Sequence, residues 1–392
     1  MAITFKLFDF DSHYYEAKDA FTRYADPALG SRGVQWAMIN GRERLVVAGH
    51  VNRYILNPTF DPVARPGALF SWYRGNPGAL DLKDAFGELE PIHPEYRDRN
   101  ARLAVMDDQG VGGSLLFPTL GVGMEDALKQ DPEAASKVFR AFNSWLEDDW
   151  GFTYRDRLFA VPYICFLDPQ EAEVELRRVL DQGAVAVNIR NAPVPVPGGY
   201  RSPFDPQYDG FWGLAAESGA VVATHAGVEG YDAVVNMWEP GTENSLFRSP
   251  LRGLISKGRA VADFYGAAVC QLIFERFPGL RLASVENGAS WVPDLLYRLK
   301  SAASRSPGYF SVDPVETFCN HVWVTPFWED NVESIAQTIP LDRILLGSDW
   351  PHAEGLVQPI DFVTEALSWA DDRSKERIGR NNAVELLGVS AP

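Results

Sequence analysis

The stretch Arg343-Ile344-Leu345-Leu346-Gly347-Ser348-Asp349 joins a short apolar run to a glycine turn and a carboxylate. Similar runs rich in Val, Ile, Leu or Phe recur along the chain, and most lead into a polar or glycine-containing turn. The runs are residues 3–10, 113–118, 158–165, 184–190, 220–225, 280–285, 321–324 and 343–346. Short continuous apolar runs of this kind are typical of strands buried on both faces of a parallel sheet.

Helical patterns separate several of these runs. Residues 131–150 begin with a proline at the second position and carry Val138, Phe142 and Trp145 at helical spacing. Residues 170–182 and 290–301 show comparable patterns. Eight strands alternating with helices predict an α/β fold of the (β/α)8 TIM-barrel type, which needs about 250 residues.

The chain has 392 residues, so the surplus over a minimal barrel is expected to lie in long loop insertions. Residues 24–100, dense in proline, glycine and aromatic side chains, are the first, and residues 228–262 are the second. Both follow predicted strand ends, and we expect them to cap the active site at the C-terminal face of the barrel. Because no repeat or flexible linker is evident, residues 1–392 are predicted to form a single domain.

Composition narrows the classes of function. There are 36 Lys and Arg against 53 Asp and Glu, a net charge of −17, and no basic cluster, which argues against a nucleic-acid partner. Three cysteines without a C-x-x-C pair indicate neither a disulfide framework nor a zinc ribbon. The first residues do not form a signal peptide, and no apolar run reaches about 18 residues. We therefore expect a cytoplasmic protein with no membrane partner and a small-molecule substrate.

Side chains that bind metal ions gather at the predicted strand ends. The candidates are Asp11, His13 and Glu16 after the first run, His225 after the fifth, and Asp349 and His352 after the eighth. Singly, each has an ordinary structural explanation, as a helix cap or a hydrogen-bonded core histidine. Because the C-terminal ends of barrel strands converge on one mouth, their joint occurrence predicts a divalent metal site.

Five residues have predicted roles with open alternatives. Asp349 would also transfer a proton in catalysis, and Glu286 would be a catalytic carboxylate orienting a ligand or a metal-bound water, or simply a helix N-terminal acid. His50, inside the first insertion, would be a further ligand or a strand-edge histidine. Arg190 would bind a substrate carboxylate or pair with a barrel acid. Trp350 would line an aromatic substrate pocket or pack in the core.

Three motifs carry a family resemblance: Asp9-Phe10-Asp11-Ser12-His13, Thr224-His225-Ala226-Gly227 and Leu346-Gly347-Ser348-Asp349-Trp350-Pro351-His352. They resemble the amidohydrolase-related TIM-barrel enzymes, the group that includes aminocarboxymuconate semialdehyde decarboxylase, over nearly the whole chain. The resemblance implies four metal ligands, Asp11, His13, His225 and Asp349.

The sequence departs from this family pattern at three places. An aspartate, Asp11, occupies the first ligand position, where the family has His or Glu. Glu286 and Asn287 stand where many members end the sixth strand with a catalytic histidine. The first run continues as Tyr14-Tyr15-Glu16, which places another carboxylate near the predicted metal. In addition, Arg190 follows the fourth run in place of a lysine, so a carbamylated lysine bridging two zinc ions is not expected.

Residues 11–16, Asp-Ser-His-Tyr-Tyr-Glu, also resemble dinuclear hydroxylases of the amidohydrolase fold. We therefore favour a dinuclear Fe or Mn/Fe oxygenase that hydroxylates a small organic substrate with dioxygen, its second ion held by Glu16, His352 and His50 or His321. The alternative is a mononuclear Zn- or Mn-dependent hydrolase or nonoxidative decarboxylase of a carboxylic acid. A third possibility is a non-catalytic partner subunit. A homo- or hetero-oligomer is expected in each case.

Overall fold

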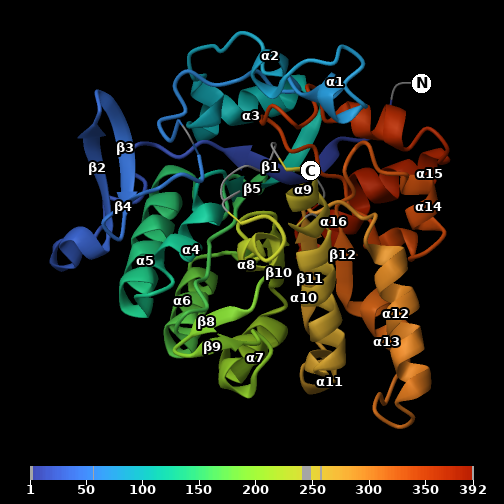
Figure 1. The fold of residues 1–392 in the computed structure, drawn as a ribbon. Helices are drawn as coiled ribbons and strands as arrows, with labels where there is room; N and C mark the ends of the chain where they lie inside the picture. Colours follow the sequence, from blue (N-terminus) through green and yellow to red (C-terminus); the bar gives the residue numbers. More distant parts are fainter. Residues whose placement is uncertain (1–2, 56, 241–248, 257, 391–392) are drawn as a thin grey trace.

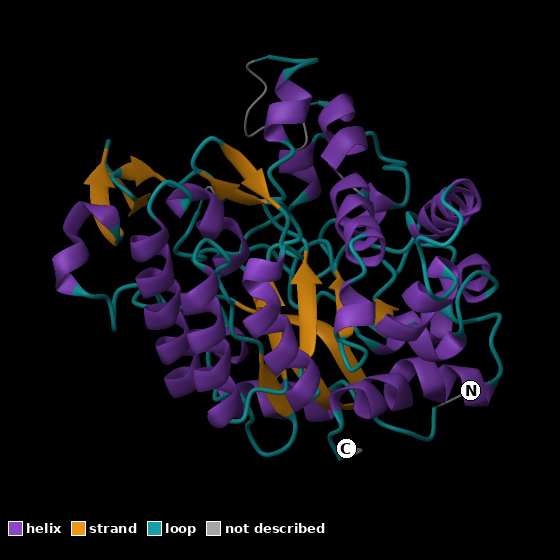
Figure 2. Ribbon diagram, turned by 90° about the horizontal axis from the view of Figure 1, so that it is seen from below, coloured by secondary structure: helices purple, strands orange, loops and turns teal. Residues whose placement is uncertain are grey.

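The computed structural model describes residues 3–55, 57–240, 249–256 and 258–390. Its core contains two parallel sheets surrounded by helices (Figure 2). The first sheet has the order β1 (Leu7–Tyr14), β5 (Val111–Pro118), β6 (Leu158–Ala160). The second has the order β12 (Val322–Val324), β11 (Arg281–Val285), β10 (Val221–His225), β7 (Ala186–Ile189).

Backbone bridges join the two sheets at both edges. Tyr163, after β6, forms a parallel bridge with Asn188 of β7. On the other edge, Ile344 forms a parallel bridge with Val324 of β12, and the N–H of Phe10 in β1 donates to the carbonyl of Leu346. Residues 344–346 therefore take the place of the eighth strand. The predicted TIM barrel is confirmed.

Alternate side chains of the strands fill the barrel interior, as a parallel barrel requires. This inner core includes Phe8 and Phe10 of β1, Leu115 and Phe117 of β5, Val221 and Ala223 of β10, and Ala283 and Val285 of β11. The neighbouring strand residues, such as Leu7, Leu116, Val222 and Leu282, belong to the outer core, which packs with residues of the surrounding helices.

The predicted helices lie close to their expected positions. They are α5 (Pro132–Asp149), α6 (Pro169–Asp181) and α12 (Val292–Arg305). Asp131 caps α5, because its carboxylate accepts from the N–H of Ala134. Further helices are α3 (Arg99–Asp108), α4 (Met124–Leu128), α7 (Asp209–Ser218), α10 (Arg259–Cys270), α11 (Ile273–Arg276), α13 (Pro314–His321), α14 (Val332–Ala336), α15 (Asp372–Glu376) and α16 (Asn382–Leu387). Within the described ranges, no helix is long and apolar enough to cross a membrane.

The described part of residues 24–100 includes a separate small sheet and the short helices α1 (Phe70–Tyr73) and α2 (Leu82–Ala85) (Figure 1). The antiparallel sheet contains β2 (Val34–Ile39), β3 (Arg42–Val47) and β4 (His50–Val51), and α1 and α2 follow it. The N–H groups of Gly67 and Leu69 donate to the carbonyls of His352 and Ala353. This segment therefore reaches the loop that follows the eighth strand segment.

The second predicted insertion, residues 228–262, contains α8 (Asp232–Asn236) and α9 (Pro250–Ser256), whereas residues 241–248 and 257 lie outside the described residues. A hairpin of β8 (Val194–Val196) and β9 (Gly199–Arg201) follows β7.

Two predicted strand boundaries are wrong. The first strand does not end at Phe10 but continues to Tyr14, because its later residues pair with Leu116, Phe117 and Pro118 of β5. His321 does not begin the seventh strand but ends α13, where its Nδ1 lies 2.8 Å from the carbonyl oxygen of Leu280. That position is at the N-terminal end of the barrel, so His321 cannot take part in a site at the opposite mouth.

Candidate metal centre

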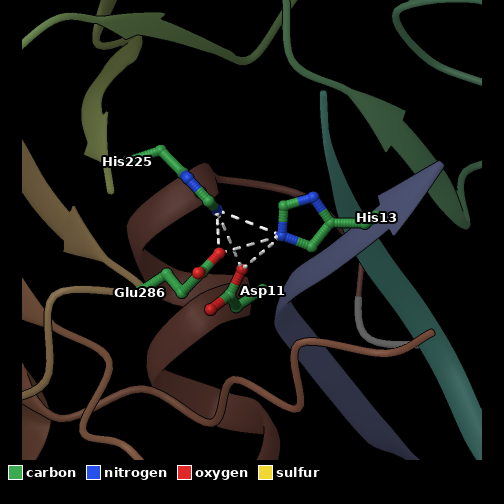
Figure 3. Close-up of side chains that lie close together, drawn as sticks. All are labelled: Asp11, His13, His225 and Glu286. Atoms are coloured by element: carbon green, nitrogen blue, oxygen red, sulfur yellow. Dashed lines mark hydrogen bonds and ion pairs between the residues drawn. The ribbon is translucent and has the colours of Figure 1, made fainter. Parts of the chain in front are cut away.

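Four side chains converge at the C-terminal mouth of the barrel: Asp11 and His13 from β1, His225 from β10, and Glu286 after β11 (Figure 3). The Nε2 atoms of His13 and His225 are 3.1 Å apart. Oε2 of Glu286 lies 3.2 Å from the first and 3.0 Å from the second. Oδ1 of Asp11 lies 3.5 Å and 3.4 Å from the same two atoms.

Local backbone irregularities aim these groups at one point. Phe8 and Phe10 already face the barrel interior, so regular alternation would turn Asp11 and His13 outward. The register of β1 against β5 shifts between Asp9 and Ser12, and this bulge restores the inward direction for both. Glu286 directly follows the inward-facing Val285 and has φ of 53°, an uncommon left-handed conformation that lets its side chain also reach the mouth.

The donor set fits a divalent metal ion. Ligand atoms about 2.0–2.2 Å from a tetrahedrally bound ion lie roughly 3.3–3.6 Å from one another, close to the spacing seen in the cluster. Oδ1 of Asp11 and Nδ1 of His13 are buried and have no hydrogen-bond partner within the described part of the chain. A buried carboxylate oxygen without a donor needs a cation or a water. Two imidazoles and two carboxylates suit Zn, Mn or Fe.

The electrostatics of the cluster also favour a bound cation. Nδ1 of His225 lies 2.8 Å from the carbonyl oxygen of Ala226, so Nδ1–H donates there and Nε2 faces the centre. Burial opposes a charged His225, but the charge of Glu286 and the contact with Asp11 outweigh it and raise its pKa to about 10. Burial likewise opposes a charged Glu286, yet His225 and His13 hold the pKa of that carboxyl well below its usual range. The Glu286 carboxylate is therefore ionised and attracts positive charge.

A second group overlaps the first. Oδ1 of Asp349 lies 3.4 Å from Nε2 of His13 and 2.7 Å from Nδ1 of His352, and the rings of His13 and His352 stack at 3.9 Å. Asp349 has φ of 55°, again a left-handed backbone at a functional position. His13 and Glu286 belong to both groups. Nε2 of His13 is the donor atom in both groups, and one imidazole nitrogen binds only one ion. The two groups therefore form a single centre, with Asp349 and His352 at its side.

Hydrogen bonds fix the ring of His352. The hydroxyl of Thr119 donates its only proton to the carbonyl of Tyr14, so it must accept from Nε2–H of His352, 2.9 Å away. An unprotonated Nδ1 then faces Asp349. Two unprotonated atoms would repel at 2.7 Å, so one proton is shared by the pair. Burial and the charge of Glu286 raise the pKa of Asp349, whereas burial and the charge of His13 lower the pKa of His352, so these directions favour Asp349 over His352 as the holder of the shared proton.

The structure does not bring Glu16 or His50 into the cluster. The buried carboxylate of Glu16 accepts hydrogen bonds from two backbone N–H groups. Oε1 accepts from Leu120 and from Gly121, both at 2.9 Å, and Oε2 accepts from Leu120 at 3.0 Å. His50 is exposed on β4, in the small sheet of residues 24–100. Of the residues predicted to build a second metal site at the mouth, only His352 lies beside the centre.

Replacing Glu16 by glutamine should therefore leave the metal content of the protein unchanged. The expected result is the same number of ions per chain in wild type and variant, measured by elemental analysis after loading with Mn²⁺ and gel filtration. Loss of one ion per chain in the variant would instead support a dinuclear centre.

The same variant should change how stability depends on pH. Burial outweighs the amide hydrogen bonds and raises the pKa of Glu16 to about 7, above its usual 4.5. When the pKa of a carboxyl is higher in the folded than in the unfolded protein, its protonated form stabilises the fold. This stabilisation is complete below the pKa of the unfolded protein and is lost as the pH rises through the pKa of the folded protein. The stability of Glu16→Gln relative to wild type should thus increase between about pH 4.5 and 7. Denaturant unfolding at several pH values measures this, and a flat difference would contradict it.

Arg190 and Trp350 both contact other side chains or the backbone of the chain, although Nη1 of Arg190 has no hydrogen-bond partner among the described residues. Arg190 donates to the carbonyl of Val228 at 2.5 Å and to Oδ1 of Asp126 at 2.9 Å. The ring of Trp350 lies 4.5 Å from the guanidinium carbon of Arg102, and Trp350 is buried. Both arrangements agree with the structural alternatives, and the substrate-binding roles of Arg190 and Trp350 stay predictions. From the sequence, Glu286 is predicted to orient a ligand or a metal-bound water. In the structure it lies among the donor atoms themselves.

A family model described as Amidohydrolase matches residues 91–389, which is more than half of the chain. The chain belongs to the amidohydrolase family. This membership confirms the resemblance drawn from the sequence motifs. The amidohydrolase is also similar over 99% of its length, with 40% identity and a TM-score of 0.94, to the whole chain of an amidohydrolase from Mycobacterium avium subsp. paratuberculosis K-10. No curated protein matches it.

More distant solved structures share the fold of this amidohydrolase. The 2,6-dihydroxybenzoate decarboxylase from Rhizobium is 20% identical, with a TM-score of 0.60 over 84% of this chain and 97% of its own. A dihydroxybenzoic acid decarboxylase from Polaromonas sp. JS666, solved with bound manganese and the inhibitor 2-nitroresorcinol, is 18% identical, with the same TM-score and coverage. At this identity the likeness shows the fold alone. The family match and the donor cluster together make the protein a metal-dependent enzyme of the amidohydrolase superfamily. The comparisons give no support to an oxygenase.

Proposed function

We propose that this amidohydrolase is a nonoxidative decarboxylase of a small carboxylic acid, acting with one divalent metal ion. The observation that carries the proposal is a single compact donor group, Asp11, His13, His225 and Glu286, with the close pair Asp349 and His352 at its side. The names of the two decarboxylases of similar fold support the same reaction class. This reaction replaces the oxygenase that the sequence led us to favour.

The number of available donors argues for one ion. A dinuclear centre would need a second set of ligands. The residues predicted to provide it either lie away from the donor group or have their polar atoms directed to other partners. Glu16 is bound by two backbone amides and His50 is exposed on the outer sheet. His352 directs one nitrogen to Thr119 and the other to Asp349.

The reaction needs a proton donor. When the bond between the substrate carbon and its carboxyl group breaks, carbon dioxide leaves and the electron pair stays on the carbon. Asp349 can supply the proton that this carbon then takes up, because the Asp349–His352 pair holds one proton at the edge of the donor group. A hydrolase would instead require an unprotonated base at this position to activate water. A proton held by the pair of Asp349 and His352 therefore favours decarboxylation over hydrolysis.

The metal would be held by Asp11, His13, His225 and Glu286, and when bound it supplies positive charge that polarises oxygen atoms of the substrate. Mn²⁺ and Zn²⁺ both suit this donor set. The chain itself fixes the imidazole of His225 through the carbonyl of Ala226 and that of His352 through Thr119.

The test is carbon dioxide release from a panel of hydroxybenzoates and small aliphatic carboxylic acids, under argon and under air. Metal-dependent release that is equal in both atmospheres supports the proposal. Oxygen consumption with a hydroxylated product would overturn it in favour of the oxygenase. Cleavage of an ester or amide panel without any carbon dioxide release would overturn it in favour of a hydrolase. The protein treated with a chelator and then reloaded with Mn²⁺ serves as the control.

A further inference from the structure

We infer that Asn287 is a positioning residue that sets the spacing between His225 and Glu286 and thereby the affinity of the centre for its metal ion. The inference rests on the metal centre of the proposed function but not on the reaction. Asn287 lies directly after Glu286, at the mouth end of β11.

The side-chain amide of Asn287 joins the two strands that end in these donors. Its Nδ2 donates to the carbonyl of Thr224 at 3.0 Å and to the carbonyl of Val285 at 2.8 Å. Thr224 precedes His225, and Val285 precedes Glu286. Because carbonyl oxygens only accept, the NH2 end of the amide must face both of them. One amide group thus holds the last peptide before each of the two donors.

This contact lies where the regular sheet ends. The pairing of β10 with β11 ends at His225 and Val285, and the N–H of Ala226 adds one further bond to the carbonyl of Val285. Beyond that point Glu286 turns away with its φ of 53°. The spacing of His225 and Glu286 is therefore not determined by strand pairing alone. On the other edge of β10, Oδ1 of Asn188 accepts from the N–H of His225 at 3.1 Å.

A purely structural role is the competing explanation, and the chain contains a matched case. Nδ2 of the buried Asn382, in α16, also donates to two backbone carbonyls, those of Leu341 and Ile344, both at 2.7 Å. These carbonyls lie at and before the start of the eighth strand segment, away from the mouth. Asn382→Leu therefore removes the same two kinds of hydrogen bond without touching the neighbours of His225 or Glu286.

The experiment compares Mn²⁺ binding by calorimetry in wild type, Asn287→Leu and Asn382→Leu. Leucine matches the shape of asparagine but donates no hydrogen bond. Partners that orient metal ligands typically contribute about 10–100-fold to metal affinity, and we expect a loss of this size in Asn287→Leu. The electron paramagnetic resonance spectrum of bound Mn²⁺ should change in the same variant. Asn382→Leu should lower the melting temperature but leave the Mn²⁺ affinity within about threefold.

Unchanged Mn²⁺ affinity in Asn287→Leu, or an equal loss in both variants, would overturn the inference. If Asn287→Leu does not fold, Asn287→Gln keeps the amide on a longer side chain, and a smaller but measurable loss of affinity is then expected. Failure of the wild type to bind Mn²⁺ would refute the metal centre of the proposed function. Normal binding that is insensitive to Asn287 would refute this inference alone.

Discussion

Replacement of His225 by alanine should remove the metal ion and lower kcat/KM by about 1,000-fold, which corresponds to ~4 kcal/mol of transition-state stabilisation. Nε2 of His225 lies within 3.4 Å of both Asp11 and Glu286, and its Nδ1 is anchored at Ala226. Alanine removes a donor that is already oriented for the ion. The loss of metal affinity should exceed the roughly 10–100-fold that removal of an orienting partner costs.

Metal content per chain and steady-state kinetics measure this effect, with His50→Ala as the matched control. His50 is exposed on β4 and has a predicted ligand role, so the same substitution there tests both expectations. His50→Ala should keep its metal and its activity. One ion retained with full affinity by His225→Ala would show that the ligand set is different. Loss of an ion in His50→Ala would restore the dinuclear hypothesis.

The barrel and part of the centre follow from local sequence patterns. Short apolar runs ending in polar residues predict strands whose C-terminal ends meet, and Asp11, His13 and His225 do meet there. This prediction needs no knowledge of side-chain direction, because the topology of a parallel barrel brings all the strand ends to one mouth.

The direction of a side chain at a strand end depends on details that a single sequence does not reveal. The left-handed backbone conformation of Glu286 brings its side chain into the donor group. From the sequence alone, Glu286 could equally be an acidic residue at a helix N-terminus. Glu16 lies only three residues from His13, yet its carboxylate turns to the amides of Leu120 and Gly121 in the loop after β5. His50 belongs to the antiparallel pair of β3 and β4, in the small sheet and away from the donor group. Nearness in sequence to the donors therefore does not bring Glu16 into the cluster, and the second metal site stays a prediction that the Glu16 and His50 variants test.

The proton on Asp349 is the second feature on which activity should depend strongly. Asp349→Asn should lower kcat by about 100- to 10,000-fold, the usual contribution of a general acid. The amide of asparagine can still donate to the unprotonated Nδ1 of His352, as the protonated carboxyl does, so the local geometry should persist. What the variant lacks is a proton that it can release. KM and the metal content should therefore change little, because the Asp11, His13, His225 and Glu286 donors are intact.

The control for this variant is Asp168→Asn, which makes the same substitution at the N-cap of α6, where the carboxylate accepts from Gln170 and Glu171. Asparagine caps helices about as well as aspartate, so kcat should be unchanged. A fall in kcat at constant metal content identifies Asp349 as the proton donor. If Asp349→Asn instead loses its ion, the carboxylate is a metal ligand, as the family resemblance implies, and Glu286 is the group whose role must be reassigned. Full activity with full metal content would exclude Asp349 from the reaction, and the acid would then have to come from the substrate or from water.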